Sequence, residues 1–257
     1  MKYNFLNIPF CNIHSQPSTK SEISSQILYG EKFRILDKKK NWIRIQTSFD
    51  RYKGFIKLKK FNEKFSAEKK ICKLKSKIYN KINNKYIPTN KYLFFSSGIA
   101  IKNSNKRFLE FEKNKWIKKN DTIRISHKEK NFKKIFKSFL NSKYLWGGKT
   151  ADGIDCSALI QIYFYYNRIF FPRDSKDQIK FCKKKNTKEV LKLKKKIIFW
   201  KGHVAMNIDK KNLIHAYGPK KRVIIMNTKK TISKILKDAF LKPIFLNNSK
   251  KWIKIFK

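Results

Sequence analysis

Three residues of the chain have the types and spacing to form a nucleophile and its base. Cys156 lies where a helical pattern of apolar residues begins, directly after Asp155. A thiol becomes a strong nucleophile when its thiolate is favoured, and the free N–H groups of a helix N-terminus favour the thiolate. A nearby imidazole must take the thiol proton, and a third group must orient that imidazole. His203 and His215, on two successive predicted strands, are the candidates for these two roles.

The spacing of the two histidines restricts the turn between their strands. With a five-residue turn in an antiparallel pair, residue 205 would oppose residue 215, and His203 would lie diagonally across from His215. Such a diagonal is about 7–8 Å, within reach of two imidazole side chains. A four-residue turn would place the rings on opposite faces, so the hypothesis requires a turn of odd length or a bulge. A single cysteine or histidine is more often structural than catalytic, so spacing alone leaves the function open.

The elements that would position these residues are two helices and a glycine-rich loop. Gly147, Gly148 and Gly153 lie within seven positions of a chain that has only 8 glycines, which predicts an unusual backbone before Cys156. Apolar residues at helical spacing predict one helix over 132–140 and a second from Cys156 to about residue 167. The apolar faces comprise Phe132, Ile135, Phe136, Phe139 and Leu140 in the first helix, and Leu159, Ile162, Tyr163 and Tyr166 in the second.

Four predicted strands follow the helices and a basic stretch over 183–196. They cover residues 197–200, 203–208, 213–217 and 223–226. Helices followed by an antiparallel sheet predict an α+β domain.

The residues before the helices read as two small β units. Short alternating runs separated by polar, lysine-rich turns cover about 16–61 and, more loosely, 72–125, and they predict two small β-barrels. In both units a glycine-containing strand precedes a lysine-rich turn and a Trp-Ile strand, which indicates a divergent duplication. The predicted domains are therefore 1–62, 63–128 and 129–257.

The net charge of +47 has two interpretations. A polyanionic partner such as nucleic acid or an acidic surface would explain it. However, only eight of the 64 basic residues are arginine, and the lysines are spread from end to end. Nucleic-acid readers use arginine for bidentate contacts. We therefore favour a compositional origin and expect no specific nucleic-acid partner.

The first residues and the cysteines indicate a compartment. Residues 1–15 contain no continuous apolar run long enough for a signal peptide, and no stretch approaches the length of a membrane span. The four cysteines, at positions 11, 72, 156 and 182, fit neither a disulfide scaffold nor a zinc site. The expectation is a cytoplasmic protein with free thiols.

Five blocks around the candidate residues resemble the NlpC-type family of cell-wall cysteine peptidases, in the family's order. They cover roughly residues 132–226 and are Tyr144-Leu145-Trp146-Gly147-Gly148, Gly153-Ile154-Asp155-Cys156-Ser157-Ala158-Leu159-Ile160-Gln161, Pro172-Arg173-Asp174-Ser175-Lys176-Asp177-Gln178, Gly202-His203-Val204-Ala205-Met206 and Leu213-Ile214-His215-Ala216-Tyr217-Gly218. The β units resemble bacterial SH3-like modules, particularly in Leu28-Tyr29-Gly30-Glu31 and Tyr52-Lys53-Gly54-Phe55. The whole chain resembles the γ-D-glutamyl-L-diamino acid endopeptidases of peptidoglycan recycling.

The resemblance implies a papain-like fold in which Cys156 is the nucleophile, His203 the base and His215 the orienting residue. In relatives, a tyrosine of the first SH3-like module closes the far end of the groove; Tyr52 is the best match here and Glu31 a weaker one. No metal or cofactor is implied. The residues implied to line the substrate pocket are Tyr144, Asp155, Ser157, Asp174 and Ser175.

Two positions depart from the family pattern. Ala158 stands where the family usually has glycine, and alanine is the better helix former by about 1 kcal/mol. Lys195 and Lys196 replace the Gly-Asp pair that normally precedes the first active-site strand. The second departure adds positive charge beside the expected groove and concerns substrate binding, not the catalytic residues.

The implied function is hydrolysis of the γ-D-glutamyl–diamino acid bond in peptides such as L-Ala-γ-D-Glu-diamino acid, so that the partners are peptidoglycan stem peptides. Two alternatives are a hydrolase that remodels intact peptidoglycan and a non-catalytic basic binding protein. The sequence leaves open which diamino acid is preferred and the oligomeric state.

Overall fold

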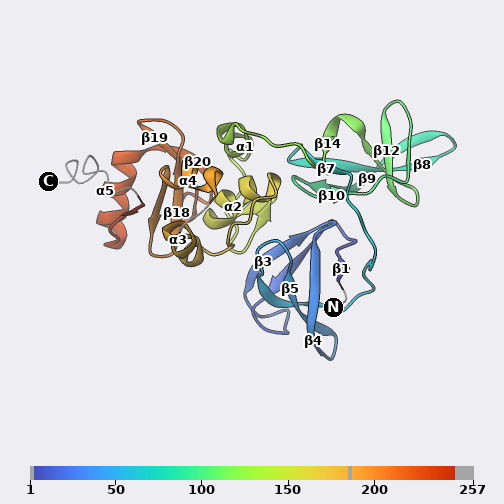
Figure 1. Cartoon of the computed structure of the whole chain (residues 1–257), viewed down its shortest axis with the longest axis horizontal. Helices are drawn as coiled ribbons and strands as arrows, with labels where there is room; N and C mark the ends of the chain where they lie inside the picture. The colour runs from blue at the N-terminus through green and yellow to red at the C-terminus, as the bar shows by residue number, and fades with distance from the viewer. Residues whose placement is uncertain (1–2, 185–186, 247–257) are drawn as a thin grey trace.

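The structure is a computed structural model that describes residues 3–184 and 187–246. Three parts follow one another along the chain: two β units, drawn in blue and in teal to green, and an α/β part drawn in yellow to red (Figure 1). The exact boundaries of the predicted domains, after residues 62 and 128, stay predictions. None of the described helices is both long enough and apolar enough to cross a membrane.

The first β unit is a six-stranded antiparallel sheet in the order β1-β4-β5-β6-β2-β3. Its strands are β1 (Asn4–Phe5), β2 (Phe10–His14), β3 (Ile23–Leu28), β4 (Lys32–Lys39), β5 (Trp42–Thr47) and β6 (Lys53–Lys57). Alternation places Ile43 and Ile45 of β5 in the core, while Arg44 between them is exposed. The predicted strands are therefore confirmed, and β1 and β2 both precede the range that the sequence indicated.

The second β unit combines a three-stranded sheet, β10-β7-β14, with a five-stranded sheet, β11-β12-β13-β8-β9. The strands are β7 (Lys69–Ile71), β8 (Lys75–Ile82), β9 (Lys85–Phe94), β10 (Gly98–Ile99), β11 (Asn103–Ser104), β12 (Phe108–Glu112), β13 (Lys115–Lys118) and β14 (Thr122–Arg124), with the 3₁₀ turn η1 (Lys119–Asp121) before β14. The apolar run over 93–101 is divided between β9 and β10 by a turn in which Ser96 has a φ of 71°. Both units are β structures as predicted, but the pairings among the described strands do not close either of them into a barrel.

The α/β part places helices before an antiparallel sheet in the order β20-β19-β18-β17-β21, as the α+β prediction requires. The helices are α1 (Phe132–Ser138), α2 (Cys156–Tyr166), α3 (Ser175–Lys183), α4 (Lys188–Lys194) and α5 (Thr228–Ala239). The strands are the short pair β15 (Lys149–Thr150) and β16 (Gly153–Ile154), then β17 (Ile197–Trp200), β18 (His203–Asn207), β19 (Asn212–Tyr217), β20 (Arg222–Asn227) and β21 (Ile244–Phe245), with η2 (Gly218–Lys220) after β19.

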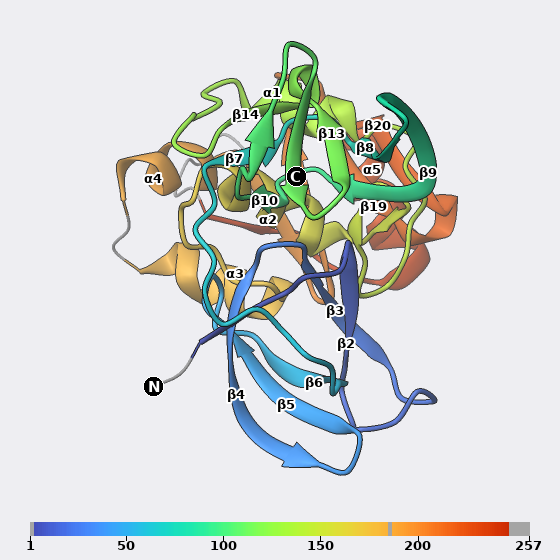
Figure 2. The ribbon, with the colours of Figure 1, turned by 90° about the vertical axis from the view of Figure 1, so that its right-hand side faces the viewer.

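Helix α2 is the centre of the molecule. All but one of its residues are buried, because it packs on β18 and β19 on one side and on α1 and α3 elsewhere. Phe95 of the second β unit also packs into this core, stacked on Tyr166 at 4.7 Å. Figure 2 shows the first β unit below the helices and the second in front of them, facing the viewer. The position of Cys156, at the start of α2, is therefore fixed by the helices, strands and second β unit that pack on this helix.

Candidate active site

The loop before α2 has the unusual backbone that its glycines predict. Gly147 has a φ of +72°, and a Cβ atom there would lie 2.1 Å from the carbonyl oxygen of Ile23 in the first β unit. A Cβ at Gly148 would lie 2.4 Å from the carbonyl oxygen of Gly153. This close packing turns the chain so that Cys156 begins the helix at a fixed place.

The Cys156 thiol is almost fully enclosed, with 4% of the residue exposed. Burial raises its pKa to about 12, and the negative charge of Asp155 acts in the same direction. The backbone N–H groups of Val204 and Ser157 lie near the sulfur and, with the charge of Arg173, offset part of this rise in pKa. The expectation that the helix start favours the thiolate is thus incomplete, because burial outweighs it and the resting group is a neutral thiol.

The two histidines lie on the same face of the sheet. β18 and β19 pair with Met206 opposite Ile214, and residues 208–212 form the five-residue turn that the hypothesis requires. Nε2 of His203 and Nδ1 of His215 are 2.9 Å apart. Val204, the neighbour of His203 in β18, lies near the Cys156 sulfur. The thiol of Cys156 and the imidazoles of His203 and His215 therefore meet in the same part of the domain.

Both imidazoles are neutral at neutral pH. Burial lowers the pKa of His203 to about 4. Burial, with the charge of His203 as the lesser cause, lowers the pKa of His215 to about 3. Tyr217 stacks on His215 at 4.5 Å, and the sulfur of Met226 lies 3.4 Å from its Nε2. These contacts hold the second ring so that its Nδ1 faces His203.

The neutral histidines predict a loss of stability in mild acid. Their pKa values in the folded state lie below the ordinary imidazole value of about 6.5, so the unfolded state binds more protons between pH 6.5 and 4. Their contribution is complete above pH 6.5 and is lost as the pH falls toward 4, by about 3 kcal/mol for His203 alone. Thermal melts of wild type and His215→Asn at pH 7, 6, 5 and 4 measure it. The variant should lose less stability than wild type over this range, whereas the exposed His127→Asn should follow wild type; equal slopes in all three would contradict the assignment.

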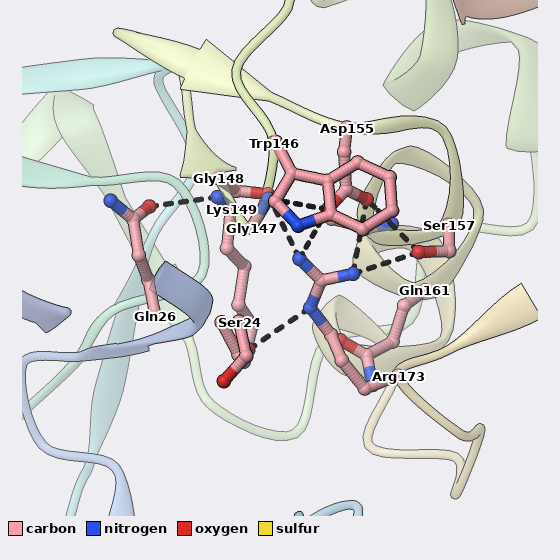
Figure 3. Close-up of polar contacts among 12 residues, drawn as sticks. Ser24, Gln26, Trp146, Gly147, Gly148, Lys149, Asp155, Ser157, Gln161 and Arg173 are labelled. Atoms are coloured by element: carbon pink, nitrogen blue, oxygen red, sulfur yellow. Dashed lines mark hydrogen bonds and ion pairs between the residues drawn. The ribbon is translucent and has the colours of Figure 1, made fainter. Parts of the chain in front are cut away.

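The Asp155 carboxylate is saturated by contacts within the protein (Figure 3). Oδ1 accepts from the N–H of Ala158 at 2.8 Å and from the hydroxyl of Ser157 at 3.0 Å; Oδ2 accepts from the N–H of Gly147 at 3.0 Å. Arg173 donates to both oxygens, at 3.0 and 2.6 Å. Asp155 and Ser157, both predicted to line the substrate pocket, therefore direct their polar atoms into the support of α2.

The other predicted pocket residues lie around this support. Tyr144 is half-buried, and its pKa is raised by burial and, as a lesser cause, by the charge of Cys156, so the two side chains lie within electrostatic reach of each other. Asp174 immediately precedes α3, with Ser175 as the first residue of that helix. The Asp174 carboxyl makes no cap hydrogen bond to α3, and burial raises its pKa.

Tyr52 extends from the first β unit toward the same place. Its hydroxyl donates to the carbonyl oxygen of Ser24 at 3.3 Å, and the charges of Asp174 and Arg173 both act on it. Glu31, the weaker candidate for this wall, is instead buried in an ion pair with Lys149 at 3.2 Å. The charge of Asp174 thus reaches Tyr52, whereas Glu31 is used in its ion pair with Lys149.

Two buried basic side chains that support the site had no role assigned from the sequence. Arg173 and Lys149 are each 2% exposed. Arg173 stands inside one of the motifs given above, and Lys149 directly follows another. Their partners in the first β unit lie more than a hundred positions away in the sequence, which no local pattern indicates.

The family model described as the NlpC/P60 family matches residues 141–240, which contain Cys156, His203 and His215. The chain carries an NlpC/P60 domain. A second model, described as the bacterial dipeptidyl-peptidase SH3 domain, matches residues 13–61. The NlpC/P60 domain is therefore preceded by an SH3 domain, as the resemblance predicted, and the SH3 match covers the first β unit from the end of β2 through β6.

Two curated bacterial proteins are similar over much of the chain. A dipeptidyl-peptidase 6 of Lysinibacillus sphaericus is 22% identical over 229 residues, which are 80% of this chain and 84% of that protein. A γ-D-glutamyl-L-lysine dipeptidyl-peptidase of Bacillus subtilis (strain 168) is 26% identical over 179 residues, 63% of this chain and 59% of that protein. Both similarities therefore extend beyond the residues that the NlpC/P60 model matches.

Two solved structures share the fold. An NlpC/P60 family protein from Bacillus cereus superposes with a TM-score of 0.71 at 18% identity, covering 88% of this chain and 94% of that one. An NlpC/P60 endopeptidase from Photobacterium damselae subsp. piscicida gives 0.59 at 14% identity, covering 95% and 70%. The arrangement of β units in front of the NlpC/P60 domain is therefore a known one.

Proposed function

We propose that the protein is a cysteine peptidase that cleaves the γ-D-glutamyl–diamino acid bond of free peptidoglycan-derived peptides such as L-Ala-γ-D-Glu-diamino acid. The observation that carries the proposal is the pair of facing histidines, His203 on β18 and His215 on β19, whose ring nitrogens are 2.9 Å apart, with Val204 of β18 beside the Cys156 sulfur. The names of the two relatives, both dipeptidyl-peptidases, support the substrate class.

The proposed reaction is acyl transfer with proton transfer at the moment of attack. Because the resting thiol and imidazole are both neutral, His203 takes the proton as the sulfur of Cys156 approaches the γ-carbonyl of D-glutamate. His215 holds the ring of His203 in the orientation that makes this transfer possible. The imidazolium then gives its proton to the leaving amine of the diamino acid, and water, activated by the neutral His203, hydrolyses the thioester.

The developing oxyanion needs donors that are already in place. The groups proposed for this role are the backbone N–H groups at the start of α2, including that of Cys156, and the hydroxyl of Tyr144. Tyr144 is included because a negative charge on the Cys156 sulfur acts on it. Each such donor is worth about 10²–10³-fold in turnover in a peptidase.

The free amine of the proposed substrate is assigned to the end of the groove. Asp155 has no free acceptor to offer a ligand, because its oxygens accept five hydrogen bonds within the protein. Asp174 is half-buried, not used as a helix cap, and faced by Tyr52. We assign the L-Ala amine to Asp174, with Tyr52 as the wall that leaves no room for a preceding glycan; release of an N-terminal dipeptide follows from this geometry.

The test compares the free tripeptide L-Ala-γ-D-Glu-L-Lys with its N-acetylated form. The free peptide should be cleaved at least about 100-fold faster in kcat/KM, because an acetyl group removes the ammonium that pairs with Asp174 and must fit against Tyr52. Tyr52→Ala should reduce the difference in kcat/KM between the two peptides, with little loss of activity on the free peptide, because Tyr52 is not one of the catalytic residues. Mass spectrometry of the products measures both rates. If wild type cleaves the two peptides equally well, there is no amine gate and the recycling assignment fails.

The second candidate function is remodelling of intact wall, for which the lysine-rich surface would hold anionic polymer. Whole sacculi in the same assay distinguish it, since a remodelling enzyme releases fragments from sacculi and the proposed one does not.

A further inference from the structure

The SH3 domain contacts the NlpC/P60 domain through strand β3 and the turn after it, on the loop that leads to Cys156. The Ser25 hydroxyl accepts from Nε of Arg173 at 3.0 Å. The side-chain oxygen of Gln26 accepts from the backbone N–H of Lys149 at 2.7 Å, and both are buried (Figure 3). Glu31 accepts from Nζ of Lys149 at 3.2 Å. These groups leave water completely, so each contact is a fixed one and not a surface ion pair.

The same two cations connect this contact to the start of α2. Arg173 holds both oxygens of Asp155, whose carboxylate accepts from the N–H groups of Gly147 and Ala158 on either side of Cys156. It also donates to the hydroxyl of Ser157 at 2.8 Å. A chain of buried hydrogen bonds therefore runs from Ser25 through Arg173 and Asp155 to the residues that flank the thiol.

Steric contact adds to these hydrogen bonds. Because a Cβ atom at Gly147 would lie 2.1 Å from the Ile23 carbonyl, the backbones of the two domains touch here with no room for a side chain. One residue earlier, the indole N–H of Trp146 donates to Glu22 of the SH3 domain. The loop over 146–149 is thus held at successive positions by the residues around β3.

We propose that Arg173 is a positioning residue, and that through it the SH3 domain holds Cys156 at the place where it can attack. The inference rests on the proposed peptidase function and adds to it that the SH3 domain contributes to turnover, besides closing the groove. Helix capping alone does not need this arrangement, because Asp155 could cap α2 without a second domain. What Ser25 and Arg173 add is a fixed direction for the Asp155 carboxylate, and hence for the first turn of α2.

The consequence is an effect on kcat rather than on KM. A displacement of the sulfur by about 1 Å costs on the order of 100-fold in the chemical step, while contacts to the amine and side chains of the peptide remain. Ser25→Ala with Gln26→Ala removes two acceptors at the domain contact without touching the predicted catalytic or pocket residues. We expect kcat to fall about 10–100-fold with KM within about twofold of wild type. Arg173→Lys keeps the charge but cannot span both Asp155 oxygens and Ser25 at once, and should show the same split.

The chain offers a matched control. Ser24→Ala with Gln46→Ala makes the same two chemical changes in the same domain, but the hydroxyl of Ser24 bonds within the domain to Ile13 and the side chain of Gln46 to Arg34 and Arg51. Both double variants are compared by thermal melt, by steady-state kinetics on the free tripeptide, and by hydrogen exchange followed by mass spectrometry. Exchange in the segment 145–160 should rise in the Ser25/Gln26 variant and stay at the wild-type level in the Ser24/Gln46 control.

The two hypotheses fail in different ways. If wild type cleaves the peptide and the Ser25/Gln26 variant keeps the wild-type kcat, the positioning role is overturned while the proposed function stands. The same holds if KM rises with kcat unchanged. If wild type cleaves no peptide, the proposed function fails, and exchange over 145–160 alone decides whether the SH3 domain holds the start of α2. Unchanged exchange in that segment overturns the inference, and a rise confined to it supports the coupling.

Discussion

Replacement of Cys156 by alanine is expected to lower kcat for the free tripeptide by at least about 10⁴-fold, with the fold retained. The Cys156 sulfur is the group proposed to form the acyl intermediate, since the neighbouring Ser157 hydroxyl is hydrogen-bonded to Asp155 and Arg173. The variant removes one buried sulfur atom at the N-terminus of α2. The cap of this helix, Asp155, and the other hydrogen bonds of its first turn are made by backbone or carboxylate groups and remain in place. Steady-state rates and the thermal midpoint measure both halves of the expectation.

Cys182 provides the matched control for this variant. It is also buried, and burial raises its pKa to about 12 as well, yet it lies on α3 in the core of the domain. Cys182→Ala should therefore cost some stability and leave kcat within a few-fold of wild type. Full activity in Cys156→Ala, or an equal loss in both variants, would rule out Cys156 as the nucleophile.

The local geometry of the site could be predicted from the sequence because it depends on short-range patterns. Apolar spacing located α2, which begins at Cys156 and ends at Tyr166, one residue before the expected end. The alternation of β18 and β19 and the length of the turn between them fixed which faces His203 and His215 share. A residue's face on a helix or strand follows from a period of 3.6 or 2, so these features needed no knowledge of the rest of the chain.

Other features depended on tertiary packing and could not be predicted. Helix α4 occupies a stretch that read only as basic, because three of its seven residues are lysines and its burial rests on Val190 and Leu193 alone. Helix α5, with its many lysines, was missed for the same reason. In both, a narrow apolar stripe packs against the domain while the remaining surface is charged.

The polar contacts of Asp155 were the feature of the site that the sequence concealed most. Its carboxylate was expected to line the substrate pocket, but it accepts five hydrogen bonds from four residues in three segments of the chain. The raised pKa of Cys156 has a similar origin, since it follows from enclosure by α2 and β18 and not from helix position alone. Burial is a property of the assembled fold, so a sequence pattern indicates which groups meet but not how far water is excluded from them.

His203→Ala is expected to lower kcat/KM by about 10³–10⁴-fold, because the resting thiol is neutral and cannot attack without a base. The loss of kcat/KM on removal of His203 should be larger than in a site whose cysteine is already a thiolate before substrate binds. His127→Ala, at an exposed position, is the matched control and should retain wild-type activity. Recovery of activity in His203→Ala on addition of imidazole would support the base role, provided that the rescued rate rises with the imidazole concentration.

The pH dependence of the wild-type rate gives the same assignment an independent measurement. The base must be neutral to accept the thiol proton, and burial lowers the pKa of His203 to about 4. The acid limb of kcat/KM should therefore lie near pH 4, well below the value of about 6.5 for an ordinary imidazole, with a tenfold loss per pH unit below it. Because stability also declines in this range, initial rates are taken after a brief exposure to acid, and activity is measured again after return to pH 7. A loss that reverses at once reports protonation of the base, whereas a slow or incomplete recovery reports unfolding. A reversible acid limb near pH 6.5, kept in His203→Ala, would assign the base to another residue.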